Sequence, residues 1–304
     1  MIKIHKTKAP TLDKMSGLTW YIVGPPKSGK TTNASRWSSE GHKRVLIIDT
    51  DKGTDFLEDS DTIPTYWLSA PKYFNEEKGC HLTTEPSERG YYFRSGELKG
   101  RPMPVYSIGE IITELKNGTI PDVYETIVID TVDKINEWCE NKVKTDLGID
   151  DISEAGFGRG WSEARELCIK VITAFQDHCK AKGMNLILIS HSKETQVTDG
   201  KVQLSPNLPA GLSKRLTAMS DAIGYSTFDK ETQKPMLSFE SYDERSIGSR
   251  IPQLHNKVFP FDYAEIMKAA MDQKEKPVVK TVKKKSPEVI VNNNQQTQEM
   301  LEYA

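Results

Sequence analysis

Residues 24–31, GPPKSGKT, fit the spacing GxxxxGK[ST] of a backbone turn that binds phosphate groups. An apolar run precedes the turn and a helix-like run follows it, which is the context that such a turn needs. Lys30 would reach the β- and γ-phosphates of a nucleotide, and Thr31 would bind Mg²⁺. We therefore expect ATP and Mg²⁺ as cofactors. The expected nucleotide contacts are Gly24, Pro25, Pro26, Lys27, Ser28, Gly29, Lys30, Thr31 and Thr32.

A second ligand for Mg²⁺ is expected at the end of the apolar run TIVID, which finishes at Asp130. Ligands of α/β proteins collect at the carboxyl ends of buried strands, so this carboxylate should lie beside Thr31. The sequence DTVD also suits the start of a helix, so Asp130 could instead cap the helix that follows. The two roles are compatible.

A second acid directly after Asp130 could activate the attacking water, but Asp130 is followed by Thr131. The activating carboxylate is therefore expected elsewhere, in VLIIDTDKGTD directly after the second strand. Asp51 is our candidate for the general base, and Asp49, closer to the strand, is the more structural of the two. A plain acidic turn is the alternative. His191, at the end of NLILIS, is expected to contact the γ-phosphate, with simple packing at a strand end as its alternative.

Two arginines follow the last predicted strand, in YDERSIGSRIPQ. Arg245 and Arg250 could reach the nucleotide of a neighbouring subunit and stabilise charge in the transition state. Surface arginines without such a role are the alternative. A role across subunits would require a homo-oligomer.

Short β-rich runs alternate with longer amphipathic segments, which predicts an α/β fold with a mainly parallel sheet flanked by helices. Apolar residues between Ala164 and Phe175 recur with the spacing of one buried helix face. The predicted strands are 18–23, 44–49, 125–130, 185–190, 222–228 and 235–240. The predicted helices are 30–40, 107–117, 133–146 and 161–182.

Two stretches interrupt this alternation. Residues 70–106 are polar, aromatic and broken by Gly and Pro, so we expect an inserted hairpin or long loop. Residues 273–304 are lysine-rich and then Asn/Gln-rich, with too few apolar residues for a core. We therefore predict one ATPase domain over 1–272 and a disordered tail over 273–304, whose lysines either contact phosphates or only keep the chain soluble.

The composition excludes several classes. Of 304 residues 28% are charged, but the net charge is only −2, so nucleic-acid binding would have to be local. The longest apolar runs are too short to span a bilayer, and the N-terminal segment has no signal-peptide apolar region. We expect no membrane association and a cytoplasmic location. The four cysteines are scattered, which favours free thiols.

Two glycine-containing segments could contact a single strand of nucleic acid. Residues 148–161 alternate Gly156, Gly158 and Gly160 with aromatic and cationic side chains, a plausible stacking platform. A loop folded against the core is the alternative. Residues 193–211 are long, polar and interrupted by Gly and Pro, as in a mobile binding loop.

The order of GPPKSGKTT, VLIIDTDKGTD, YETIVIDTVDKI, GFGRGW, NLILISHSKE and the arginine pair resembles phage-type P-loop ATPases with a RecA-like core, a group that includes single-strand-annealing recombination proteins. The resemblance covers about residues 15 to 265. It implies Lys30 and Thr31 as the Walker A pair, Asp130 as the Walker B aspartate, Asp51 as the acid after the second strand, and His191 as the phosphate sensor, where recombinases usually carry Gln. It also implies single-stranded DNA and a single-strand-binding protein as partners, in the cytoplasm of a bacterial host if the gene is phage-encoded.

Three functions follow from these observations. The first is an ATP-hydrolysing DNA recombination or annealing protein that acts on single-stranded DNA as an oligomer. The second is a nucleotide-gated scaffold or regulator that acts on a protein through the 70–106 insertion. The third is a small-molecule kinase. Stimulation of ATP hydrolysis by single-stranded DNA would separate the first from the second.

Overall fold

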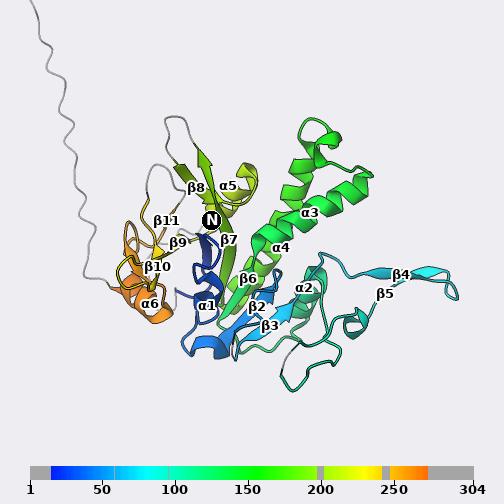
Figure 1. Ribbon diagram of the computed structural model, residues 1–304, viewed down its shortest axis with the longest axis horizontal. Coiled ribbons are helices and arrows are strands. Elements are labelled where there is room, and N and C mark those ends of the chain that lie inside the picture. The colour runs from blue at the N-terminus through cyan, green and yellow to red at the C-terminus, as the bar shows by residue number, and fades with distance from the viewer. Residues whose placement is uncertain (1–14, 58, 95, 197–201, 242–246, 273–304) are drawn as a thin grey trace, which may run out of the picture. The chain divides into compact units, whose positions relative to one another are not determined.

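The computed structural model describes residues 15–57, 59–94, 96–196, 202–241 and 247–272. Six strands form the parallel centre of its sheet (Figure 1). They are β1 (Thr19–Gly24), β2 (Val45–Asp49), β3 (Asp61–Pro64), β6 (Thr126–Asp130), β7 (Asn185–Gln196) and β9 (Ala222–Phe228). Their order across the sheet is β9-β1-β7-β6-β2-β3, and every neighbouring pair is parallel.

Antiparallel strands extend this centre at one side. Strand β10 (Pro235–Ser238) pairs with β9, and β12 (Val258–Pro260) pairs with β10. Two further strands branch off: β11 (Gly248–Ser249) pairs with β9, and β8 (Val202–Pro206) pairs with β7.

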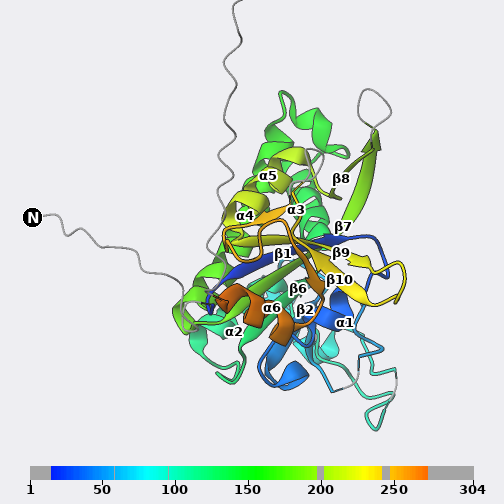
Figure 2. The ribbon, with the colours of Figure 1, turned by 90° about the vertical axis from the view of Figure 1, so that its left-hand side faces the viewer.

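Helices cover both faces of the sheet, because successive strand residues point to opposite sides. Helices α2 (Ile108–Asn117), α3 (Val132–Leu147), α4 (Arg159–Lys182) and α5 (Ala210–Met219) pack with Tyr21 and Ile127 in one core. Helices α1 (Lys30–Ala34) and α6 (Tyr263–Met271) pack with Trp20 and Val128 in the other. Figure 2 looks onto the α6 side. The predicted α/β fold, a mainly parallel sheet between helices, is confirmed.

The six predicted strands are all present, but the predicted helix 30–40 is too long. Helix α1 ends at Ala34, and a tight turn follows in which the Ser38 hydroxyl donates to the carbonyl of Gly41. The chain turns there because Trp37 enters the core, with its ring 5.0 Å from that of Trp20. Burial of the indole outweighs the helical pattern of the sequence.

The expected loop 193–211 is also wrong over most of its length. Strand β7 continues to Gln196 and pairs with β8 in an antiparallel ribbon, and helix α5 begins at Ala210. The segment is polar and interrupted by Gly and Pro, and for this reason its sequence predicted a loop. Residues 197–201 lie outside the described ranges.

The insertion 70–106 contains an antiparallel pair, β4 (Lys72–Asn75) and β5 (Cys80–Thr83), which forms a two-stranded sheet of its own. The segment from 84 to 106 returns to the start of α2. The predicted tail 273–304 lies outside the described residues. None of the helices in the described ranges combines the length and apolar character needed to cross a bilayer.

Candidate nucleotide-binding site

The phosphate turn runs from the end of β1 at Gly24 to the start of α1 at Lys30. A Cβ on Gly24 would lie 2.8 Å from the carbonyl oxygen of Ser226, so a side chain does not fit there. Gly29 has a φ of 81°, in the left-handed region that favours glycine. Both glycines of the motif are therefore required by the backbone itself.

Lys30 lies inside this turn. Its Nζ donates to the carbonyl oxygens of Gly24 (2.9 Å) and Pro25 (2.7 Å), and the residue is only 5% exposed. Burial lowers the pKa of its ammonium group, while the charges of Asp130 and Asp133 oppose that shift. A phosphate bound in the turn would compete with the two carbonyls for this buried cation.

Thr31 and Asp130 lie side by side, as the sequence predicted for a magnesium pair. The Thr31 hydroxyl donates to Oδ2 of Asp130 at 2.5 Å. Burial raises the pKa of Asp130 to about 6, the Thr31 hydrogen bond lowers it, and the charge of Asp49 raises it. The N-cap of α3 is Thr131, so Asp130 is not the capping residue.

This pair suits Mg²⁺ when phosphate oxygens complete the coordination. Within the described ranges, no group of three or more His, Cys, Asp or Glu side chains is placed to hold a metal ion by itself. A hydroxyl and one carboxylate beside a phosphate turn are the ligands that Mg²⁺ takes together with a nucleotide. The residues present therefore fit ATP with Mg²⁺.

The acidic turn after β2 is organised by Asp49. Its Oδ1 accepts from the backbone N–H groups of Asp51 (3.1 Å) and Gly53 (3.2 Å), and its Oδ2 accepts from the Thr54 hydroxyl (2.5 Å). A Cβ on Gly53 would lie 4.0 Å from both Thr31 Oγ1 and Asp130 Oδ2, so the turn passes over these two side chains. Asp49 thus serves the backbone, and Asp51 stays exposed beside the site.

His191 lies next to the phosphate turn, because its Cα pairs with that of Gly24 across β7 and β1. Its backbone N–H donates to Oδ2 of Asp133 at 3.2 Å. Burial raises the pKa of Asp133, against the effect of its hydrogen bond with Ser190 and the charge of His191. Asp133 was not among the predicted site residues, although it is the second acid of DTVD and lies in the first turn of α3, just after Asp130.

Arg250 does not join this site within the described chain. Arg245 lies outside the described residues. Arg250 pairs with Asp221 at 3.1 Å and donates to the carbonyl of Ala218 at 2.5 Å. Its neighbour Ser249 pairs with Ala222 at the start of β9, the opposite end of the parallel strands from the phosphate turn. Arg250 therefore does not serve its own subunit's phosphate site.

The glycine-rich segment 148–161 is packed against the protein on one side and exposes aromatic side chains on another. A Cβ on Gly160 would lie 2.6 Å from the carbonyl oxygen of Ile152, so one side of the segment is packed. Phe157 is fully exposed, and Trp161, in the first turn of α4, is 43% exposed. Figure 1 shows this connection and the β7–β8 ribbon projecting from the same edge of the sheet.

Fold and site together define a P-loop ATPase with a mainly parallel sheet between helices. An AAA domain model matches residues 16–257, and the chain belongs to this family. The crystal structure of the RadB recombinase is similar to this chain, with 12% sequence identity and a TM-score of 0.36. The match covers 80% of this chain and 86% of the RadB chain. A similarity of this size does not extend that protein's activity to this chain. No curated protein matches the sequence.

Proposed function

We propose that this protein is an ATP-hydrolysing recombination or single-strand-annealing protein that acts on single-stranded DNA. The observation that carries the proposal is the shared edge of the sheet. The phosphate site lies at the carboxyl ends of β1 and β6, and the connection carrying Phe157 and Trp161 projects from that same edge. Exposed aromatic rings beside flexible glycines stack unpaired bases without sequence preference.

Each site residue has a distinct role in this proposal. ATP with Mg²⁺ supplies the phosphoanhydride that is hydrolysed. Lys30 neutralises phosphate charge, and Thr31 and Asp130 hold the metal ion. Asp51 accepts a proton from the attacking water, since Asp49 is occupied by the turn.

His191 would detect the γ-phosphate and transmit its loss along β7 to the β7–β8 ribbon. Its position beside Gly24 supports this role, because the same strand continues from the phosphate site into the ribbon. Asp133 would orient the His191 backbone through the hydrogen bond at 3.2 Å.

We propose further that the protein works as a homo-oligomer. Arg250 lies at the end of the strands remote from its own phosphate turn, so it could complete a site only in a neighbouring subunit. A closed or helical head-to-tail assembly brings opposite ends of successive subunits together.

The proposal is tested by the rate of ATP hydrolysis with and without single-stranded DNA. We expect stimulation by single-stranded DNA, little effect of duplex DNA, and no hydrolysis by Lys30→Ala, whose fold should be intact. An active enzyme whose rate of ATP hydrolysis is the same with and without single-stranded DNA would refute the DNA part of the proposal. Near-native turnover of Lys30→Ala at saturating ATP would refute the phosphate site.

A second candidate is a nucleotide-gated regulator that binds a protein. Tyr73 and Phe74 of β4 are 49% and 56% exposed, and exposed aromatic side chains on a projecting hairpin are common in protein interfaces. This function predicts hydrolysis that DNA does not change, and the same assay therefore separates the two.

A further inference from the structure

A cavity of about 740 Å³ lies at the carboxyl ends of β2 and β3, outside the phosphate site. The acidic turn lines one side with Lys52 and Asp55, and Tyr66 follows β3. The insertion closes the other side with Tyr91, Tyr92 and Arg94. Neither residues 24–31 nor Asp130 are among the described residues that line it. Its volume is in the range of small-molecule pockets.

The wall of this cavity is an aromatic cluster. The rings of Tyr66 and Tyr91 are stacked, with centroids 4.6 Å apart and planes at 27°. Trp67 meets both rings edge-on, at 5.9 Å from Tyr66 and 5.8 Å from Tyr91. The Lys52 ammonium lies 4.7 Å from the centroid of Tyr66, within the range of a cation–π contact. The ammonium therefore covers the Tyr66 ring, and a base that stacks there would take its place and leave Lys52 free to reach a phosphate.

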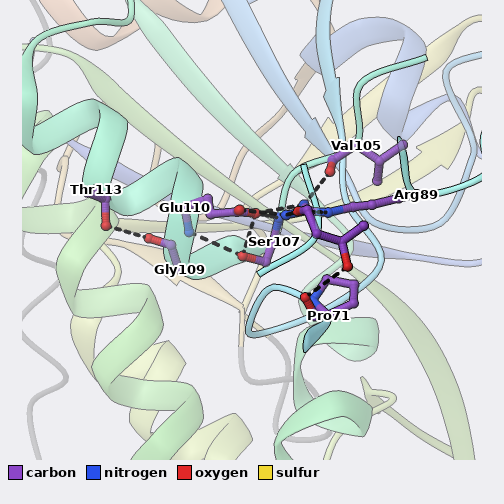
Figure 3. A network of polar contacts seen from close by, with 8 residues as sticks. Pro71, Arg89, Val105, Ser107, Gly109, Glu110 and Thr113 are labelled. Carbon is purple, nitrogen blue, oxygen red and sulfur yellow. Dashed lines mark hydrogen bonds and ion pairs between the residues drawn. The ribbon is translucent and has the colours of Figure 1, made fainter. Parts of the chain in front are cut away.

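The insertion side of the cavity is held in place by Arg89 (Figure 3). Its guanidinium donates to both carboxylate oxygens of Glu110 at 2.6 and 2.8 Å, and to the carbonyls of Thr84 and Val105. The Arg89 side chain is 1% exposed, and Glu110 also closes the capping box of α2 with Ser107. Because this network fixes the segment just before Tyr91, the aromatic wall is preformed.

We infer that this cavity binds an unpaired base of single-stranded nucleic acid, stacked on the Tyr66–Tyr91 pair. The inference rests on the proposed function and adds a contact point outside the segment 148–161. Aromatic rings stack on any base, and Lys52 and Arg94 supply cations for the adjoining phosphates. Tyr92, 58% exposed, adds a further ring at the cavity.

The two carboxylates that line the cavity do not oppose this ligand equally. Both carboxylate oxygens of Asp49 already accept hydrogen bonds from the acidic turn. Asp55 lies 3.8 Å from Arg94, so a phosphate would have to compete with Asp55 for that guanidinium. Asp55→Asn should therefore tighten binding of single-stranded DNA.

The cavity and the phosphate site share one wall, the turn from Asp51 to Asp55. One side of this turn approaches Thr31 and Asp130 at Gly53, and the other lines the cavity. A base in the cavity would thus contact the segment that carries Asp51. This shared wall supplies a direct route from strand binding to the rate of hydrolysis.

The test uses the full-length chain and a fluorescent oligo(dT) strand, with binding followed by anisotropy. Stacking contributes about 1–3 kcal/mol per base, so Tyr66→Leu and Tyr91→Leu should each weaken binding by about 5- to 150-fold. Tyr73→Leu, on the exposed hairpin and outside the cavity, is the matched control and should bind like the native protein. Arg94→Gln should reduce the salt dependence by about one unit of slope.

Photocrosslinking of the native protein to a strand containing 5-iododeoxyuridine locates the bound base without any substitution, so the result does not depend on the folding of a variant. We expect crosslinks at Tyr66, Tyr91 or Tyr92. Native-like binding by both leucine variants, with crosslinks elsewhere, would overturn the inference and leave the proposed function standing. Leucine variants that lose ATP binding but retain DNA binding would assign the cavity to the base of ATP, and this result would also overturn the inference. A native protein that binds no single-stranded DNA would instead refute the proposed function.

Discussion

Replacement of Asp130 by Asn should stabilise the protein without nucleotide at neutral pH and remove a pH dependence. Asp130 is only 4% exposed, and burial raises its pKa to about 6. An unfolded aspartate has a pKa of about 3.9. Because the folded pKa is the higher one, folding favours the protonated carboxyl group. The stabilisation is present below about pH 4 and is lost as the pH rises through about 6.

The size of the effect follows from the two pKa values. A difference of about two units corresponds to about 3 kcal/mol, at about 1.4 kcal/mol per unit. Between pH 4.5 and 7.5 about 2 kcal/mol of this should be lost, because part of the unfolded chain is already ionised at pH 4.5. Asn keeps an oxygen that can accept from the Thr31 hydroxyl, but it carries no charge and does not titrate.

The measurement is urea unfolding of both proteins at pH 4.5 and 7.5. The difference in free energy of unfolding between Asp130→Asn and the native protein should favour the variant by about 2 kcal/mol more at pH 7.5 than at pH 4.5. Titrating groups that both proteins share cancel in this difference. Asp150→Asn, at an exposed site after α3, should show no such change. ATP with Mg²⁺ at 100 times Kd should cancel most of this advantage of Asp130→Asn, because it stabilises the native protein by about 2.7 kcal/mol and the variant binds it poorly. A relative stability that is the same at both pH values would refute the burial argument.

Three further outcomes follow from the same geometry. Asp51→Asn should lower the turnover number about 10²- to 10⁴-fold with little change in ATP affinity, and equal losses in both would indicate a structural acid. Arg89→Met should lower the free energy of unfolding by about 3 kcal/mol, whereas Lys142→Met, in an exposed ion pair, should change it by less than about 0.5 kcal/mol. A mixture of Lys30→Ala and Arg250→Ala subunits should regain part of the ATPase activity if Arg250 acts across subunits. No recovery after confirmed subunit exchange would remove that role.

The sequence by itself determined the phosphate turn and the strands around it. Gly24, Gly29, Lys30 and Thr31 belong to one short segment, so their spacing alone specifies a turn between a strand and a helix. Strands β1, β2 and β6 are buried along their whole length, so each is a largely apolar run in the sequence. The carboxylate at Asp130 could be predicted for the same reason, since a strand end in such a sheet faces the ligand edge.

The extent of the elements depended on packing that no local pattern records. The helical pattern of residues 30–40 stops at Ala34 because Trp37 is drawn to Trp20, in a strand that lies earlier in the chain. Helix α6 had no predicted counterpart. A short amphipathic segment is stable as a helix only when its apolar face packs against other residues, here Phe239 and Phe261.

Only the tertiary structure decided which polar residues share a site. Asp133 meets His191 across 58 residues of chain. Asp49 is buried and accepts the hydrogen bonds of its turn, whereas Asp51 is exposed. Tyr66, which follows β3, stacks on Tyr91 of the insertion. The physical reason is that hydrophobic periodicity reports which face of an element is buried, whereas long-range polar and ring contacts depend on where the folded backbone places two distant segments.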